Sequence, residues 1–217
     1  MPRQYQPPQS LRFVAEEVPA FIKARTHHKK ADDIDVPYQV FLERWQAFEY
    51  LYQEVAPLAR KHDRAVFARD AGEAEVLTAC LSQLSRPRID AILGNSAIAD
   101  LNVRFARLDT RILFADNHML EDMGLDDKMW QIAKKDLRFA LKANTQKGLH
   151  AVALLLLMVR ASCDPKVKKS VSLVKDEAAL TPANSLLKDC VVHLVEHFDK
   201  QATEFFKPAF RGPMRRV

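Results

Sequence analysis

Glycine is scarce in this chain. Its 217 residues include five glycines, each isolated, where average usage of about 7% would give roughly three times as many. Loops that cradle phosphate through clustered glycines, such as the P-loop and the dinucleotide-binding loop, are therefore excluded. The GxSxG turn of serine hydrolases is absent as well. The sequence thus excludes two common nucleotide-binding motifs and one common way of presenting a catalytic serine.

Cysteine and long apolar segments are also rare. Cys80, Cys163 and Cys190 are odd in number and lack CxxC spacing, which indicates a reducing compartment and no disulfide framework. The apolar run at residues 151–159 has about half of the roughly 20 residues that a bilayer requires, and the N-terminus has no apolar signal core. We therefore expect a cytoplasmic protein without a membrane partner.

Positive charge is concentrated at the two ends of the chain. The net charge is +5. Residues 1–30 carry six Lys/Arg and two Glu, and residues 204–217 carry four Lys/Arg and one Glu, so the middle of the chain is slightly acidic. Basic ends on a nearly neutral protein suit an acidic partner such as nucleic acid. Terminal tails that bind no partner and are only hydrated would have the same composition.

Apolar residues recur at helical spacing through most of the chain. Phe41, Trp45, Phe48 and Tyr52 define one apolar face of a helix that opens at Val36-Pro37. No segment keeps strand-like alternation over more than four or five residues. The sequence predicts an all-α fold, a single-domain bundle of about six to eight helices over residues 10–206. A flexible lead-in at 1–9 and a basic tail at 207–217 flank this domain.

Breaker residues predict where these helices begin and end. The expected boundaries are a helix at about 11–25 with a kink or break at Pro19, a helix at about 64–84 that Arg86-Pro87 ends, and helices at 96–123 and 125–143. Gly148 is expected to separate the last of these from the apolar helix, and residues 164–182 to form a loop or short helix. Thr181-Pro182 is expected to start a final helix that runs to about residue 206, with six apolar residues facing inward: Leu186, Leu187, Cys190, Val191, Leu194 and Phe198.

A histidine pair on the final helix matches a metal-binding pattern. His193, Glu196 and His197 form HxxEH, which is similar to the motif of the inverzincin zinc peptidases, where the two histidines bind zinc and the glutamate is the base. Those enzymes take a third, acidic ligand from well downstream, and only twenty residues follow His197 here. We therefore read the motif as a surface face and expect no metal and no other cofactor.

Two arginines are better candidates for a functional site. Arg111 and His118 are seven residues apart, so two helical turns bring them to one face, where they could stabilise a phosphorane-like charge and move a proton. A solvated polar stripe has the same spacing. Arg160 directly follows nine apolar residues and must find water or an acidic partner, for which Asp164 and Glu49 are the candidates.

With these residues in view, the chain resembles the HEPN superfamily, helical proteins that include RNases of toxin–antitoxin, anti-phage and CRISPR systems. The resemblance covers about residues 36–200. Its first part is the aromatic helix, Phe41 to Tyr52, which follows the family pattern F-x-x-x-W-x-A-F-N/E-x-x-Y. Its second part is the apolar helix that ends in Val159-Arg160, followed by Lys166 to Lys169 and a leucine-rich helix. The resemblance implies a helical bundle whose arginine belongs to an RNA-cleaving site.

The chain departs from the family pattern directly after this arginine. Family RNases have a polar residue and then a histidine four to six positions after the arginine, whereas residues 161–167 read Ala-Ser-Cys-Asp-Pro-Lys-Val. The sequence therefore predicts a non-catalytic HEPN-like protein that binds RNA, another nucleic acid or a protein partner, and the resemblance implies a prokaryotic defence or toxin–antitoxin system. The expected binding residues are Arg160, Lys166, Lys168, Lys169, Arg211, Arg215 and Arg216.

Two alternatives remain open from the sequence. One is a metal-independent ribonuclease in which Arg111 and His118 are catalytic. The other is a structural subunit of a larger assembly, including a homo-oligomer, with the N-terminal tail ordered on a neighbour.

Overall fold

The computed structural model describes residues 9–59, 72–107, 128, 145–163 and 172–209. In these ranges the chain forms helices and no strand, which confirms the all-α class. The elements in chain order are α1 (Gln9–Asp32), α2 (Pro37–Glu49), the π-helix η1 (Tyr50–Val55), α3 (Ala56–Ala59), α4 (Glu73–Leu81), α5 (Arg86–Leu93), α6 (Ala97–Arg107), α10 (Thr145–Ser162) and α11 (Glu177–Ala209).

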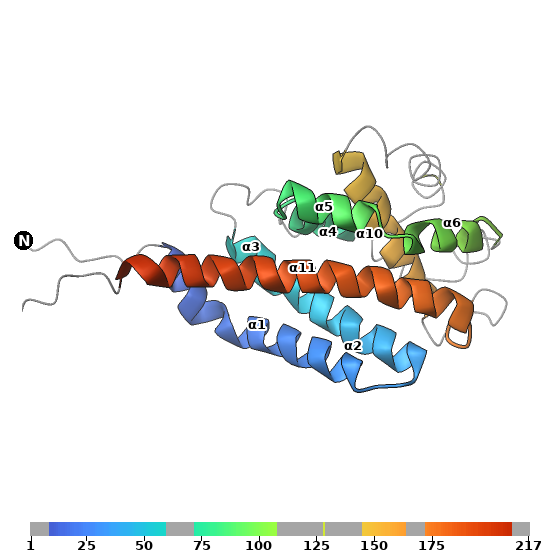
Figure 1. Ribbon diagram of the computed structural model, residues 1–217, viewed down its shortest axis with the longest axis horizontal. Helices are drawn as coiled ribbons and strands as arrows, with labels where there is room; N and C mark the ends of the chain where they lie inside the picture. The colour runs from blue at the N-terminus through green and yellow to red at the C-terminus, as the bar shows by residue number, and fades with distance from the viewer. Residues whose placement is uncertain (1–8, 60–71, 108–127, 129–144, 164–171, 210–217) are drawn as a thin grey trace, which may run out of the picture.

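The long helix α11 organises the bundle. It runs along the long axis of the molecule, with α1 and α2 on one side in the view of Figure 1 and α4, α5, α6 and α10 on the other. α11 packs against α1, α2, α5, α6 and α10, and α10 packs in turn against α4. The aromatic helix and the apolar helix of the sequence, which are α2–η1 and α10, are therefore held by one shared element.

The expected aromatic face forms the centre of the core. Phe41, Trp45, Phe48 and Tyr52 are all buried. Ring centroids are 6.1 Å apart for Phe41 and Trp45, 5.9 Å for Trp45 and Phe48, and 5.4 Å for Phe48 and Tyr52. The last two pairs have the edge-to-face geometry that aromatic rings favour.

The apolar helix is buried on all sides. Every residue from Ala151 to Val159 is at most 2% exposed, as a helix without a polar face requires. Within the described residues, no helix is both long and apolar enough to span a bilayer. The six inward residues expected on the final helix, from Leu186 to Phe198, are also buried, which confirms that prediction.

The sequence predicted a kink or a break at Pro19, and the structure shows no break there. α1 continues through this proline to Asp32, seven residues beyond the expected end. A proline inside a helix costs about 3 kcal/mol because it removes a hydrogen bond and crowds the preceding turn. Here Ala20, Ala24 and Ala31 are buried, and α1 packs on α2, η1 and α11. This tertiary contact offsets the local cost.

Three other boundary predictions were also wrong. α4 ends at Leu81, and Pro87 lies in the first turn of α5, where a missing N–H is harmless. Gly148 lies inside α10 and is buried, so it is not a separator. α11 begins at Glu177, before Thr181-Pro182, because the Asp176 carboxylate accepts a hydrogen bond from the Ala179 N–H at 3.2 Å and caps the helix. The helix expected at 125–143 lies outside the described residues, apart from Lys128 in a helical position.

Candidate functional site

One of the predicted site residues, Arg160, lies within the described part of the chain. The other predicted residues, Arg111, His118, Lys166, Lys168, Lys169, Arg211, Arg215 and Arg216, lie outside it. The structure thus locates Arg160 and leaves the Arg111 and His118 pair as a prediction.

Arg160 occupies the last turn of α10. Its side chain is half-buried, whereas its neighbours Val159 and Ala161 are buried. A cation at this end of a helix interacts favourably with the helix dipole. Among the described residues, no hydrogen bond or salt bridge engages its guanidinium. This group therefore keeps five N–H donors that the described fold does not use.

A polar cluster lies beside Arg160, and we call Tyr52, Glu73, Glu49 and Gln53 the Tyr52 cluster. The hydroxyl of Tyr52, which is buried in η1, donates a hydrogen bond to the carboxylate of Glu73, the first residue of α4. The Gln53 amide donates to the Tyr52 hydroxyl and to the Glu49 carboxylate, both at 3.2 Å. The cluster joins η1 to α4 at the edge of the aromatic core.

Glu73 connects Arg160 electrostatically to this cluster. Burial raises the pKa of Glu73, and the negative charge of Glu49 raises it further. The Tyr52 hydrogen bond and the positive charge of Arg160 lower it, but the net pKa lies above its usual value. Burial and the Glu73 charge likewise raise the pKa of Tyr52, so its hydroxyl remains a proton donor.

These contacts revise the expected partners of Arg160. No described salt bridge joins Arg160 to Glu49, and Asp164 lies outside the described residues. The acid on which Arg160 acts is Glu73, which sequence reasoning missed. Its only sequence signal is its place after Gly72 at the start of a helix, since nothing in the sequence brings position 73 to position 160.

The thiol next to Arg160 is unreactive. Burial raises the pKa of Cys163 to about 12, although the Arg160 charge lowers it. A thiol with this pKa is protonated at neutral pH, and nucleophilic chemistry needs the thiolate. Cys163 is therefore part of the packing at the end of α10.

The end of α10 is also where the predicted lysine segment is attached. The chain leaves the described part after Cys163 and re-enters it at Ser172. The Leu173 N–H donates a hydrogen bond to the Ser162 carbonyl at 2.9 Å, so these two points lie side by side. Lys166, Lys168 and Lys169 fall between them in sequence. The described residues on either side of residues 164–171 therefore lie close to the end of α10 that carries Arg160.

Two residues of the HxxEH motif, His193 and Glu196, contact Arg88 of α5. Arg88 of α5 forms a salt bridge with Glu196 at 3.0 Å and donates a hydrogen bond to the His193 carbonyl at 3.1 Å. The buried Nδ1 atom of His193 has no hydrogen-bond partner. Among the described residues, no group of three or more His, Cys, Asp or Glu side chains is placed to hold a metal ion. The motif thus fastens α5 to α11.

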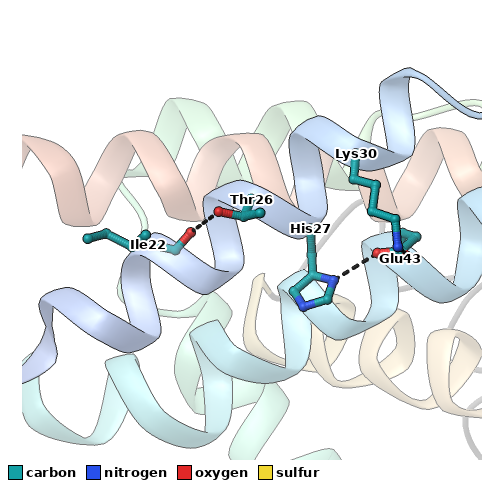
Figure 2. A network of polar contacts seen from close by, with 5 residues as sticks. All are labelled: Ile22, Thr26, His27, Lys30 and Glu43. Carbon is teal, nitrogen blue, oxygen red and sulfur yellow. Dashed lines mark hydrogen bonds and ion pairs between the residues drawn. The ribbon is translucent and has the colours of Figure 1, made fainter.

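A second polar site lies between α1 and α2. Figure 2 shows His27 and Lys30 reaching from α1 to Glu43 on α2. The His27 Nδ1 atom is 2.8 Å from a Glu43 carboxylate oxygen, and the Lys30 ammonium donates to the other oxygen. Burial raises the pKa of Glu43, but the hydrogen bonds from Lys30 and His27 outweigh it and hold the pKa below its usual value. Glu43 therefore holds two α1 side chains in place.

The chain matches no protein-family model, no curated protein and no solved structure. The HEPN-like resemblance therefore remains a prediction that rests on the aromatic helix, the apolar helix and Arg160.

Proposed function

We propose that this chain is a non-catalytic, HEPN-like helical protein that binds RNA, as part of a prokaryotic defence or toxin–antitoxin system. The observation that carries the proposal is the position of Arg160. Its guanidinium has no hydrogen bond or salt bridge among the described residues, and it lies at the end of α10, near the Ser162 carbonyl that accepts a hydrogen bond from the Leu173 N–H. Lys166, Lys168 and Lys169 follow Arg160 within nine positions of the sequence.

The chemistry of these side chains suits a phosphate backbone. An arginine fork binds phosphate oxygens through two parallel hydrogen bonds, and lysines neutralise the neighbouring phosphates as point charges. Glu73 limits this attraction because its carboxylate lies close enough for Arg160 to lower its pKa. The basic tail carries Arg211, Arg215 and Arg216, which are further candidates for contacts with RNA phosphates.

The absence of catalysis follows from the residues after Arg160. General acid–base cleavage of RNA needs a group that takes and returns a proton near neutral pH. Histidine is the usual group, and positions 161–167 contain none. Cys163, the titratable thiol in this stretch, has a pKa raised to about 12 and cannot replace it.

The test is the binding of fluorescein-labelled RNA, measured by fluorescence anisotropy over a series of salt concentrations. For single strands, the slope of log K against log salt changes by about 0.7 for each phosphate contact. Changing Lys166, Lys168 and Lys169 together to Ala should reduce the slope by about 2, and Arg160→Gln should reduce it by about 0.7. Lys147→Ala, which removes an exposed lysine at the opposite end of α10, is the matched control and should change neither slope nor affinity. Affinity that is the same at all salt concentrations would contradict the proposal.

The same RNA also tests the two alternatives. RNA incubated with the protein and a chelator should remain intact. Cleavage that His118→Ala abolishes would instead assign the chain as a metal-independent ribonuclease. A stable assembly, seen in the mass of the purified protein, together with no RNA binding would assign it as a structural subunit.

A further inference from the structure

A group of cationic and aromatic side chains lies on the exposed side of α1 and η1, and we call Lys23, His27, Lys30 and Tyr50 the Tyr50 patch. The His27 and Tyr50 rings are stacked, with centroids 5.8 Å apart and an interplanar angle of 23°. The Lys23 ammonium lies over the Tyr50 ring, 5.3 Å from its centroid. Lys23, His27 and Lys30 are three and four residues apart on α1, so they share one helix face.

We propose that the Tyr50 patch binds single-stranded RNA, with one base stacked on Tyr50 and the neighbouring phosphate on Lys23. This inference rests on the proposed function, because it names the kind of RNA and a second contact surface for it. Stacking on an aromatic ring needs an unpaired base, so the patch selects single strands over duplexes.

Tyr50 is half-buried and packs against the core, and the Lys23 ammonium lies over its ring. Because Lys23 is an exposed side chain, moving its ammonium aside would free the part of the ring that it covers. No described carboxylate forms a salt bridge with Lys23. A lysine on its flexible stem can leave the ring when a base arrives and move to the adjoining phosphate, because both positions lie within reach of the same side chain.

The rest of the patch is already positioned for binding. Glu43 bonds both His27 and Lys30, as Figure 2 shows, and so fixes the His27 ring against Tyr50. Tyr50 opens a π-helix, a rare element that is frequent at functional sites. Ordering the side chains before binding lowers the entropy cost of ordering them on the ligand.

The charge of the surrounding α1 surface favours a polyanion. Lys23, Arg25, Lys29 and Lys30 are all exposed on this helix. Glu43 neutralises one of them, and Asp199 is 3.7 Å from Arg25, with both of these side chains 60% exposed. An exposed pair of this kind contributes little binding and can exchange its partner for a phosphate.

The experiment measures anisotropy of a labelled oligouridine and of a labelled RNA duplex of equal length with the full chain. Stacking is worth about 1–3 kcal/mol per base, so Tyr50→Leu should weaken oligouridine binding by about tenfold. Tyr50→Phe keeps the ring and should stay within twofold of the wild type. Lys23→Ala should reduce the salt slope by about 0.7, and Lys147→Ala should not change it. Circular dichroism melting verifies that each variant is folded.

The outcomes separate this inference from the proposed function. Salt-sensitive binding that responds to Arg160→Gln but not to Tyr50→Leu would overturn the Tyr50 patch and leave the proposed function standing. Equal affinity for the duplex and oligouridine would also overturn it. If the wild-type protein binds neither RNA, both proposals fail.

Discussion

The Tyr52 hydroxyl donates its hydrogen bond to the Glu73 carboxylate, so a buried π-helix residue is bonded to the first residue of α4. This hydrogen bond links the aromatic helix to α4, the helix on which α10 packs. Because Arg160 lowers the pKa of the same carboxylate, the aromatic helix and the apolar helix α10 both act on Glu73.

Removing the Tyr52 hydroxyl should destabilise the protein with little change in packing. Tyr52→Phe keeps the ring, which is 1% exposed, and leaves the Glu73 carboxylate partly desolvated without its donor. We expect the free energy of unfolding at pH 7 to fall by about 1–2 kcal/mol. Urea unfolding measures this change. Tyr50→Phe is the matched control and should change it by less than about 0.5 kcal/mol.

The charge of Glu73 should make a distinct contribution to the pH dependence of stability. Burial raises the pKa of Glu73 above its usual value, so the folded state holds this proton more tightly than the unfolded state. Ionised Glu73 therefore destabilises the folded state most above its folded pKa. This destabilisation disappears as the pH falls towards the pKa of Glu73 in the unfolded state. Glu73→Gln should therefore be more stable than the wild type above the folded pKa of Glu73. This difference in unfolding free energy should become smaller as the pH falls towards the unfolded pKa. A difference that stays constant with pH would contradict the assignment.

The salt bridge between Arg44 and Asp32 should stabilise the packing of α1 on α2. Arg44 donates to the Asp32 carboxylate at 2.9 Å and to the Asn184 carbonyl of α11 at 3.3 Å. The Arg44 side chain is 10% exposed and that of Asp32 is 44% exposed. Arg44→Ala should lower the unfolding free energy by about 2 kcal/mol, which is less than for a fully buried pair because Asp32 reaches solvent. Arg25→Ala breaks an exposed pair and should cost less than about 0.5 kcal/mol.

His28 should weaken the fold in mild acid. Burial lowers the pKa of His28, and the charges of Arg44 and Lys188 lower it further, while Asp32 raises it. The folded state therefore binds this proton less tightly than the unfolded state, whose pKa is about 6.5. Stability is full above pH 6.5 and falls as the pH decreases from there to the folded pKa. Thermal unfolding of wild type and His28→Gln across this window should show a steeper loss of stability with falling pH in the wild type.

The sequence predicted the parts of the fold that periodicity determines. The face from Phe41 to Tyr52 and the run from Ala151 to Val159 are buried as expected, because burial follows directly from apolar spacing. A break at Pro19, a separation at Gly148 and a helix start at Pro182 were not found, because tertiary packing and the Asp176 cap outweigh local propensity. Tertiary packing of this kind cannot be inferred from the residues next to a proline or glycine.

The candidate site was less predictable than the core. Arg160 could be singled out because a cation after nine apolar residues is unusual in any sequence. Glu73 could not, because its contact with Tyr52 joins residues 21 positions apart and its link to Arg160 spans a still longer stretch of chain. Partners at such distances follow from topology and not from spacing.

The buried thiol beside Arg160 should resist alkylation in the native protein. Burial raises the pKa of Cys163 from 9.0 to about 12, so its thiolate fraction at pH 8 is about a thousandfold lower than that of a free thiol. Iodoacetamide labelling followed by mass spectrometry should modify Cys163 rapidly in denaturant and negligibly without it. Because the Arg160 charge lowers this pKa, Arg160→Gln should raise it further and should not speed labelling in a folded variant. Fast native labelling of Cys163 in the wild type would show instead that the end of α10 is open to solvent, and the position assigned to Arg160 would then be wrong.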